Sequence, residues 1–309
     1  MSRLPCLATA PSGGGGFVGG TGVSTAFGTF GELLQGVLPE REGDFLVTFP
    51  IARWSVVTFR AAAESEAESV VVRPIHKRKS QQLAAMILED AGVPVGGLLT
   101  VQSGIAEGKG LASSSADLVA TARAVANAIG IDMPPARIES LLARIEPTDG
   151  VLYNGIVAFY HRRVQLHSIL GSLPPITVVG IDEGGTVDTV AFNRIPKPFT
   201  AADRHVYAEL LERMTGAVRY RDLTAIGEVA TASAVMNQAL RPKWTLDAMV
   251  AICAEVGGLG VINAHSGTTL GILFDGNDPR HRTKVSAAAR LCHELTDQVD
   301  VYHSLTLST

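Results

Sequence analysis

The sequence predicts an α+β fold in two halves. Runs rich in β-branched and aromatic residues alternate with runs of helical periodicity, but without the strict strand–helix–strand rhythm of a parallel sheet. The pattern is interrupted at Gly171–Pro175 and then restarts, which places a domain boundary near residue 172. Because 46% of the 309 residues are hydrophobic, the chain has enough apolar side chains to bury a substantial core.

The first half is expected to begin after a glycine-rich N-terminus. Residues 1–22 include the low-complexity stretch Pro11–Gly20 and are predicted to be mobile, with an N-terminal domain over 23–172. Phe45–Arg60 favours a strand in which Pro50 makes a break or an edge position. Further elements are expected at Gln81–Gly92 (helix), Gly96–Gly104 (strand), Ser113–Ile129 (helix), Pro135–Ile145 (helix) and Gly150–Leu170 (two strands joined by a tight turn).

The second half, over 173–309, alternates in the same way. Strands are expected at Ile176–Asp182, in two short segments within Gly260–Asp275, and at Val299–Leu307. Helical periodicity is found at about Ala201–Thr215, Leu223–Leu240, Leu246–Val256 and Arg280–Leu295.

Charge and cysteine content exclude several classes of protein. The formal net charge is −4, so a nucleic-acid partner is not expected, and the densest basic patch, Arg73–Ser80, is interpreted as a solvated loop or helix start. Three scattered cysteines match neither a disulfide framework nor a zinc site. No apolar run is long enough to cross a bilayer, and the N-terminus lacks a signal-peptide core. We therefore expect a cytoplasmic protein with no membrane partner.

Three consecutive serines, Ser113–Ser115, stand where a helix should begin. Ser114 and Asp117 fit the S-x-x-D form of a capping box, which needs only one such serine. Gly108 and Gly110 precede them and would let backbone approach a ligand closely, and the N–H groups of a helix start favour an anion. Composition alone leaves helix capping and phosphate binding both open.

The same stretch resembles the second motif of the GHMP kinases, a family of small-molecule kinases. It is not a Walker A loop, because Lys109 is followed by Gly110 rather than Ser or Thr. The family pattern P-x-x-x-G-L-x-S-S-A is matched by "AEGKGLASSSA", with Ala106 in place of proline. Two more stretches agree in order: "GTFGELLQG" resembles the first motif, and "GGLGVINAHSGTTLGILF" resembles the third, a glycine-rich turn that packs beside the phosphate loop.

The resemblance implies a fold and an activity. The fold is the two-domain GHMP kinase fold, a ribosomal-protein-S5-like N-terminal domain followed by a ferredoxin-like α/β C-terminal domain. With "DFLVTFPIARWS" and "IEPTDGVLYNG", the motifs are similar to the L-threonine kinases associated with cobalamin side-chain synthesis. That similarity implies transfer of the ATP γ-phosphate to L-threonine with Mg²⁺, giving O-phospho-L-threonine. Serine, homoserine or a modified hydroxy amino acid as acceptor, and a non-catalytic ligand-binding protein, stay as alternatives. Whether the chain forms a homodimer is left open.

Phosphoryl transfer needs a phosphate cradle, a metal site and an orienting group for the acceptor hydroxyl. The cradle is expected from the backbone of Gly108, Lys109, Gly110, Leu111, Ala112, Ser113, Ser114 and Ser115. Ser114 is the candidate Mg²⁺ ligand. Lys109 either neutralises phosphate charge or is an exposed loop lysine. The family resemblance makes Asp149 the candidate base with Glu146 in reserve, and turn formation with Pro147 and Gly150 is the alternative.

A free amino acid needs a counter-charge for each end. The resemblance to the first motif implies that Glu32 receives the α-ammonium group. For the carboxylate, the sequence leaves open the Ala264–Thr268 backbone or Arg53, so His265, Ser266, Gly267 and Thr268 are candidate substrate-binding residues. Thr48 and Pro50 are expected on the acceptor side. Asn237 is expected either to project toward the acceptor or to face solvent, and Trp54 is interpreted as core.

Overall fold

The computed structural model describes residues 20–41, 43–62, 69–94, 96–187, 192 and 195–306. Most of the N-terminal stretch predicted to be mobile, including its glycines up to Gly19, lies outside the described residues. The first strand starts at Thr21, slightly before the predicted domain start near Val23.

A single curled sheet runs through the chain in the order β10-β7-β9-β8-β1-β2-β4-β3, with β5 paired to β2 and β6 paired to β5. Apart from the parallel β3–β4 pair, the strand pairs are antiparallel. The strands are β1 Thr21–Val37, β2 Asp44–Ala61, β3 Val70–Arg73, β4 Gly97–Ser103, β5 Ile156–Tyr160, β6 Gln165–Gly171, β7 Ile176–Asp182, β8 Gly260–Asn263, β9 Thr269–Asp275 and β10 Val299–His303. This mixture of helix and antiparallel sheet confirms the α+β prediction.

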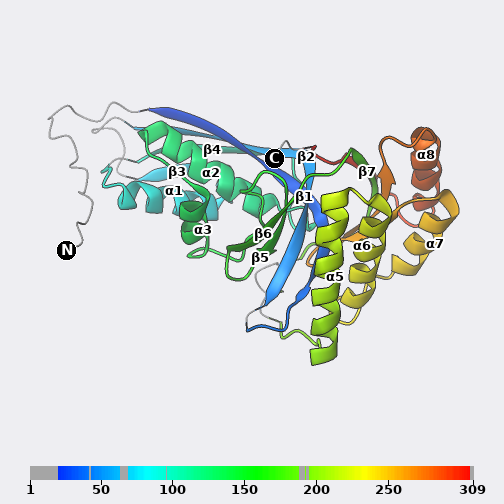
Figure 1. The fold of residues 1–309 in the computed structure, drawn as a ribbon. Coiled ribbons are helices and arrows are strands. Elements are labelled where there is room, and N and C mark those ends of the chain that lie inside the picture. The colour runs from blue at the N-terminus through cyan, green and yellow to red at the C-terminus, as the bar shows by residue number, and fades with distance from the viewer. Residues whose placement is uncertain are drawn as a thin grey trace.

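The long β1–β2 hairpin forms the middle of the molecule (Figure 1). Strand β1 was not predicted, because four glycines interrupt its apolar pattern. Packing explains two of them: a Cβ on Gly31 would lie 2.5 Å from the Asn263 carbonyl oxygen, and one on Gly36 would lie 2.3 Å from the Tyr207 ring. These glycines therefore mark close approaches within a buried strand, not a loop.

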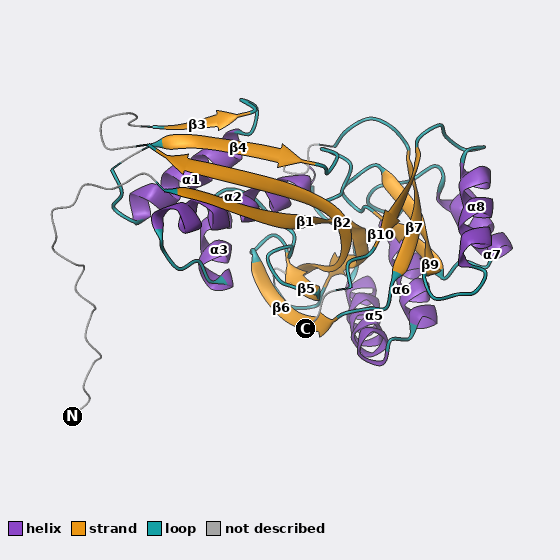
Figure 2. Ribbon diagram, turned by 90° about the horizontal axis from the view of Figure 1, so that it is seen from above, coloured by secondary structure: helices purple, strands orange, loops and turns teal. Residues whose placement is uncertain are grey.

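Helices gather at the two ends of the molecule. Figure 2 shows α1, α2 and α3 at the end where β3 and β4 lie, and α5–α8 at the other end. The helices are α1 Arg78–Asp90, α2 Ser113–Ile129, α3 Pro135–Leu142, α5 Ala201–Tyr220, α6 Leu223–Asn237, α7 Leu246–Val256 and α8 His281–Cys292. Each was predicted, with α3, α6 and α8 shorter and α5 longer than expected. No helix in the described part of the chain is both long and apolar enough to cross a membrane.

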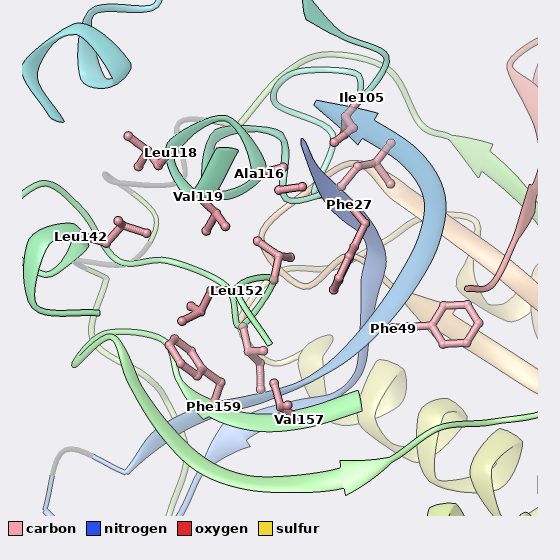
Figure 3. Packing of buried hydrophobic residues seen from close by; sticks show 14 of the residues in the cluster. Phe27, Phe49, Ile105, Ala116, Leu118, Val119, Leu142, Leu152, Val157 and Phe159 are labelled. Carbon is pink, nitrogen blue, oxygen red and sulfur yellow. The ribbon is translucent and has the colours of Figure 1, made fainter. Parts of the chain in front are cut away.

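Helix α2 lies in the main hydrophobic core. It packs on β1 and β2, and its Ala116, Leu118 and Val119 are buried (Figure 3). Thirteen of its seventeen residues are buried, so it is enclosed on nearly all sides rather than along the one apolar face that its sequence suggested.

Strand β2 continues through Pro50, so of the two predicted alternatives the break is wrong and the edge position is the one found. Pro50 pairs with Thr29 of β1, while β5 pairs with β2 at Leu46 and Val47, and β4 pairs only from Ser55 onward. Pro50 thus falls between the two ladders on that side, where its missing N–H costs no sheet hydrogen bond.

The proposed domain boundary near residue 172 falls between β6 and β7. The sheet crosses from one half to the other where β1 pairs with β8 at Glu32 and Asn263. Both strands are buried at that point. The first and third sequence motifs are therefore brought side by side at the junction of the two halves.

Candidate functional site

The loop before α2 turns sharply into the helix and leaves its first N–H groups uncapped. Gly108, Gly110 and Ala112 have φ angles of 70°, 83° and 58°. The helix begins at Ser113 with no side-chain cap, and the first backbone bond comes from the Ala116 N–H to the Ala112 carbonyl oxygen. The N–H groups of the first turn have no partner within a helix, so this end is suited to an anion.

The capping box predicted from Ser114 and Asp117 is wrong. Ser114 is the second residue of the helix, two positions after the N-cap residue Ala112, so it cannot be the cap. Asp117 instead accepts hydrogen bonds from Ser55 at 2.5 Å and from Lys77 at 2.6 Å. The serines are therefore not needed as caps.

Each serine of the cluster has its own partner. Ser113 Oγ donates to the Ile105 carbonyl oxygen at 3.2 Å and holds the loop closed. Ser114 Oγ donates to Glu146 Oε1. Ser115 Oγ accepts from the Asp149 N–H at 3.0 Å and donates to Asp149 Oδ2 at 3.2 Å. Ser114 and Ser115 thus join the start of α2 to the loop that carries both predicted carboxylates.

The third-motif turn packs on the phosphate loop, as predicted. The Lys109 carbonyl oxygen accepts from the Thr268 N–H at 3.2 Å and from Thr269 Oγ1 at 3.1 Å. A Cβ on Gly110 would lie 2.4 Å from the Ala264 Cβ, and one on Gly267 would lie 2.1 Å from the Lys109 carbonyl oxygen. Glycine is required at both positions because the two backbones are in contact.

The first motif joins the same cluster from β1. The N–H of Thr29 donates to the Leu111 carbonyl oxygen and that of Gly31 to the Gly110 carbonyl oxygen, both at 3.1 Å. Glu32 Oε2 accepts from His265, from its backbone N–H at 3.0 Å and from Nδ1 at 2.9 Å. Three segments far apart in sequence therefore meet at the loop before α2.

These segments enclose a cavity of about 390 Å³. Of the predicted site residues, those that line it are Glu32, Gly108, Gly110, Leu111, Ala112, Ser113, Ser114, Ser115, Glu146, Asp149 and Ser266. Among the described lining residues, five carboxyl groups face the cavity, from Glu32, Glu107, Asp117, Glu146 and Asp149, together with the cations Lys77, Arg78 and Lys79.

Asp149 has an unusual protonation equilibrium. Burial, together with the nearby Glu32 and Glu146 carboxylates, raises its pKa to about 7, although the Ser115 hydrogen bond opposes the shift. A carboxyl group with this pKa can accept a proton efficiently near neutral pH.

Residues 76–80 of the basic stretch Arg73–Ser80 line the cavity, and most of them are also exposed to solvent, in line with the predicted solvated loop or helix start. Helix α1 does start there, at Arg78. Lys77 Nζ bonds Glu107 at 2.5 Å and Asp117 at 2.6 Å, and Lys79 Nζ bonds Glu146. Burial lowers the pKa of Lys77, but the hydrogen bonds to the two carboxylates outweigh it and raise the pKa overall. The signal available in the sequence was the charge pattern itself, at the start of a helix that lies beside α2.

Several predicted residues do not line the cavity. Lys109 Nζ pairs with Asp182 at 2.5 Å and donates to the Gly185 carbonyl oxygen, so it is not a free loop lysine. Thr48 is buried and accepts from the Val157 N–H, while Pro50 lies in β2. His265, Gly267 and Thr268 contact residues of the site instead. His265 bonds the Glu32 carboxylate, and Gly267 and Thr268 lie against the Lys109 carbonyl oxygen.

The structure also shows where the remaining candidate residues lie. Arg53 pairs with Asp300 at 2.9 Å, with both side chains about half exposed, away from the cavity. Trp54 is 40% exposed against Phe27, so its interpretation as core is wrong. Asn237 is buried at the end of α6 and does not face solvent. His161 lies in the turn after β5 and lines the cavity.

The cavity fits a magnesium–triphosphate ligand. Ser114 and Glu146 place two oxygen donors side by side at the start of α2, and Mg²⁺ is typically held by one or two carboxylates together with substrate phosphates. The uncapped N–H groups need an anion, and the surplus of carboxyl groups needs a cation. One metal-bound triphosphate meets both requirements.

Comparisons with known proteins agree with this geometry. The model of the family described as "GHMP kinases N terminal domain" matches residues 78–161. An L-threonine kinase from Citrobacter freundii is 30% identical over 254 residues, which cover 80% of this chain and 84% of the relative. A homoserine kinase structure from Cytophaga hutchinsonii has a TM-score of 0.70 at 16% identity, covering 98% of both chains. Mevalonate diphosphate decarboxylase from Enterococcus faecalis, in complex with AMPPCP and magnesium, has a TM-score of 0.68 at 14% identity, covering 94% of this chain and 98% of the other.

Proposed function

The chain belongs to the GHMP kinases, and we propose that it transfers the γ-phosphate of ATP to the side-chain hydroxyl of L-threonine, giving O-phospho-L-threonine. Membership makes it an ATP-dependent kinase with a hydroxyl acceptor. The observation that carries the proposed chemistry is the contact of two neighbouring serines of α2 with Glu146 and Asp149. It joins a phosphate-binding helix start to a carboxyl group able to accept a proton.

The proposed residue roles follow from the contacts. The loop from Gly108 to Ala112 and the first turn of α2 bind the triphosphate through backbone N–H groups. Ser114 and Glu146 hold Mg²⁺, which would neutralise phosphate charge. Asp149 takes the proton of the acceptor hydroxyl, and Ser115 Oγ holds Asp149 in place by donating to its carboxyl group and accepting from its backbone N–H.

Glu32 is proposed to bind the α-ammonium group of the acceptor. It lines the cavity, and both of its hydrogen bonds from His265 are made to Oε2, which leaves Oε1 for a ligand. His265 is itself held by Ser233 Oγ, 2.8 Å from its Nε2. The buried Glu32–His265–Ser233 chain therefore fixes the position of the Glu32 carboxylate.

Two cations beside the third-motif turn are proposed to receive the α-carboxylate. Arg241 Nε and Lys243 Nζ donate to the Gly267 carbonyl oxygen at 3.1 and 2.5 Å. Gly267 directly follows Ser266, which lines the cavity. Burial lowers the pKa of Lys243 to about 8, with Glu183 acting in the opposite direction, so the amine stays mostly protonated at pH 7. This places a positive field at the end of the cavity that holds Glu32.

The test is ADP release with Mg·ATP and a panel of threonine, serine and homoserine. We expect threonine to give the highest kcat/KM, with a modest preference over serine because one methyl group is worth about 1–3 kcal/mol in a pocket. Higher turnover of serine or homoserine would contradict the acceptor assignment alone. Nucleotide binding without turnover of any acceptor would support the non-catalytic alternative and contradict the kinase proposal.

A further inference from the structure

The lysine and arginine side chains that line the cavity come from one short segment in the described part of the chain. Among the described lining residues, the lysines and arginines are Lys77, Arg78 and Lys79, all at the start of α1. The opposing helix start, of α2, contributes serines and backbone. A triphosphate bound at α2 therefore has this segment as its source of cationic side chains.

The three lysines near the phosphate loop differ in how completely their charge is paired with carboxylates. Lys77 is 11% exposed and lies between two carboxylates, Glu107 and Asp117. Lys109 is held by Asp182 and the Gly185 carbonyl oxygen, outside the cavity lining. Lys79 is 49% exposed and has a single carboxylate partner, Glu146.

Glu146, the partner of Lys79, also contacts the start of α2. The Glu146 carboxylate contacts Lys79 through Oε2 and Ser114 through Oε1, so one carboxyl group bridges the starts of α1 and α2. In the free protein, the Lys79 ammonium group thus occupies the cationic position beside the oxygen donors that are proposed to hold Mg²⁺. A metal at those donors would take over the Glu146 carboxylate and leave the lysine without its partner, facing the phosphates.

We propose that Lys79 binds the triphosphate of the nucleotide, supplying the phosphate-neutralising charge that the sequence had suggested for Lys109. This inference rests on the proposed nucleotide site. It does not depend on the identity of the acceptor. Lys79 exchanges Glu146 for phosphate oxygens when the nucleotide binds, and its long, half-exposed stem permits that movement.

The test is calorimetric titration of the full chain with AMPPCP, with Mg²⁺ and separately with EDTA, so that no acceptor or turnover is involved. We expect Lys79→Met to weaken binding about 10–100-fold in both conditions, since a charge-assisted hydrogen bond to phosphate is lost. Lys79→Arg should recover most of the affinity because it keeps the charge. Glu146→Gln should weaken binding only with Mg²⁺, because it removes a metal ligand and releases Lys79.

Two matched variants control for charge and for folding. Arg78→Met removes the same charge one residue earlier, and we expect a loss at least threefold smaller than that of Lys79→Met. Lys284→Met removes a lysine of α8 that pairs with Asp278, outside the cavity lining, and should leave affinity unchanged. Unchanged affinity in Lys79→Met, an equal loss in Arg78→Met, or a Lys79→Met loss confined to the Mg²⁺ condition would each overturn the proposal. Failure to phosphorylate threonine would contradict the acceptor and leave these titrations unaffected.

Discussion

Two helices of this chain begin with the same sequence pattern and use it differently. Helix α5 starts at Thr200–Asp203 and helix α2 near Ser114–Asp117, both of the form S/T-x-x-D. In α5, Thr200 is the N-cap, its hydroxyl accepts from the Asp203 N–H at 3.2 Å, and Asp203 accepts from the Thr200 N–H at 2.8 Å. In α2, the serine already lies inside the helix and the aspartate bonds Ser55 and Lys77.

The difference separates a structural helix start from a binding one. The α5 start uses its threonine and aspartate side chains to cap the N–H groups of Asp203 and Thr200, and it lies on an exposed surface rather than at a cavity. The α2 start faces a cavity and sends its hydroxyls to carboxylates, which leaves backbone N–H groups for an anion. Substitutions at α2 should therefore affect catalysis or nucleotide binding, and those at α5 should affect stability.

The largest effect is expected from Asp149→Asn, at the carboxyl group that Ser115 of α2 orients. An amide cannot accept the proton of the acceptor hydroxyl, so kcat should fall about 10²–10⁴-fold while AMPPCP affinity is retained. In the unmodified protein, kcat should rise with pH through about 7, because the deprotonated carboxylate is the active form. Steady-state kinetics across pH 5.5–8.5 measure both, and unchanged kcat in the variant would remove Asp149 from this role.

The same variant has an opposite effect on stability. Since burial and the carboxylates of Glu32 and Glu146 raise the pKa of Asp149 from 3.8 to about 7, the native state binds the proton more tightly than the unfolded state. Stability from this group is present in acid and is lost as the pH rises through that window. Asp149→Asn should therefore have a higher Tm than the unmodified protein at pH 8 and a similar Tm near pH 4. A fall in Tm at pH 8 would indicate misfolding instead.

A smaller loss is expected from Ser114→Ala. It removes one of the two oxygen donors proposed for Mg²⁺ and the hydrogen bond that positions Glu146, so kcat/KM should fall about 10–100-fold. The Mg²⁺ concentration that gives half-maximal rate should rise as well. Because the serine does not cap α2, Tm should change little, and a large drop in Tm would restore the capping interpretation that the structure contradicts.

The sequence predicted the helices and most strands better than the long-range contacts that these elements make. Each helix and the cavity-lining serines were foreseeable, because periodicity and the motif residues are local features. Strand β1 was missed because its glycines serve contacts with Asn263 and Tyr207, which lie far away in the chain. The Lys77 and Lys79 ion pairs were missed for the same reason: their carboxylate partners lie 30 to 67 positions further along the chain. The role of a charged segment can be predicted only when the fold shows which residues form ion pairs with it.

Gly110→Ala tests the loop that leads into α2. The residue has a φ of 83°, and a Cβ would meet the Ala264 Cβ and the Gly267 Cα at 2.4 and 2.9 Å. We expect a loss of about 1–3 kcal/mol in the free energy of unfolding, from backbone strain and the displaced third-motif turn. Urea denaturation measures it. Gly216→Ala, with no neighbour near the added Cβ in the middle of α5, is the matched control and should be neutral or stabilising. Equal effects would show that the contact between the two motifs does not matter.

The smallest effect is expected from Thr200→Ala, at the start of α5. Loss of the N-cap hydroxyl should lower the free energy of unfolding by about 1 kcal/mol, about 2 °C in Tm for a chain of this size, because one N–H group of the first turn loses its acceptor.

The effect of Thr200→Ala should also depend on pH, because hydrogen bonds from Thr200 hold the pKa of Asp203 below its usual value. Their contribution is present above about pH 4 and fades as the pH falls through the folded-state pKa, so the difference in Tm should be smaller at pH 3 than at pH 7. Both kcat/KM and AMPPCP affinity should stay within twofold of the unmodified protein. Thr200→Ser keeps the hydroxyl and should restore the Tm. A Thr200→Ala variant with normal Tm but impaired nucleotide binding would mean that the two helix starts do not divide the tasks of stability and binding as their contacts indicate.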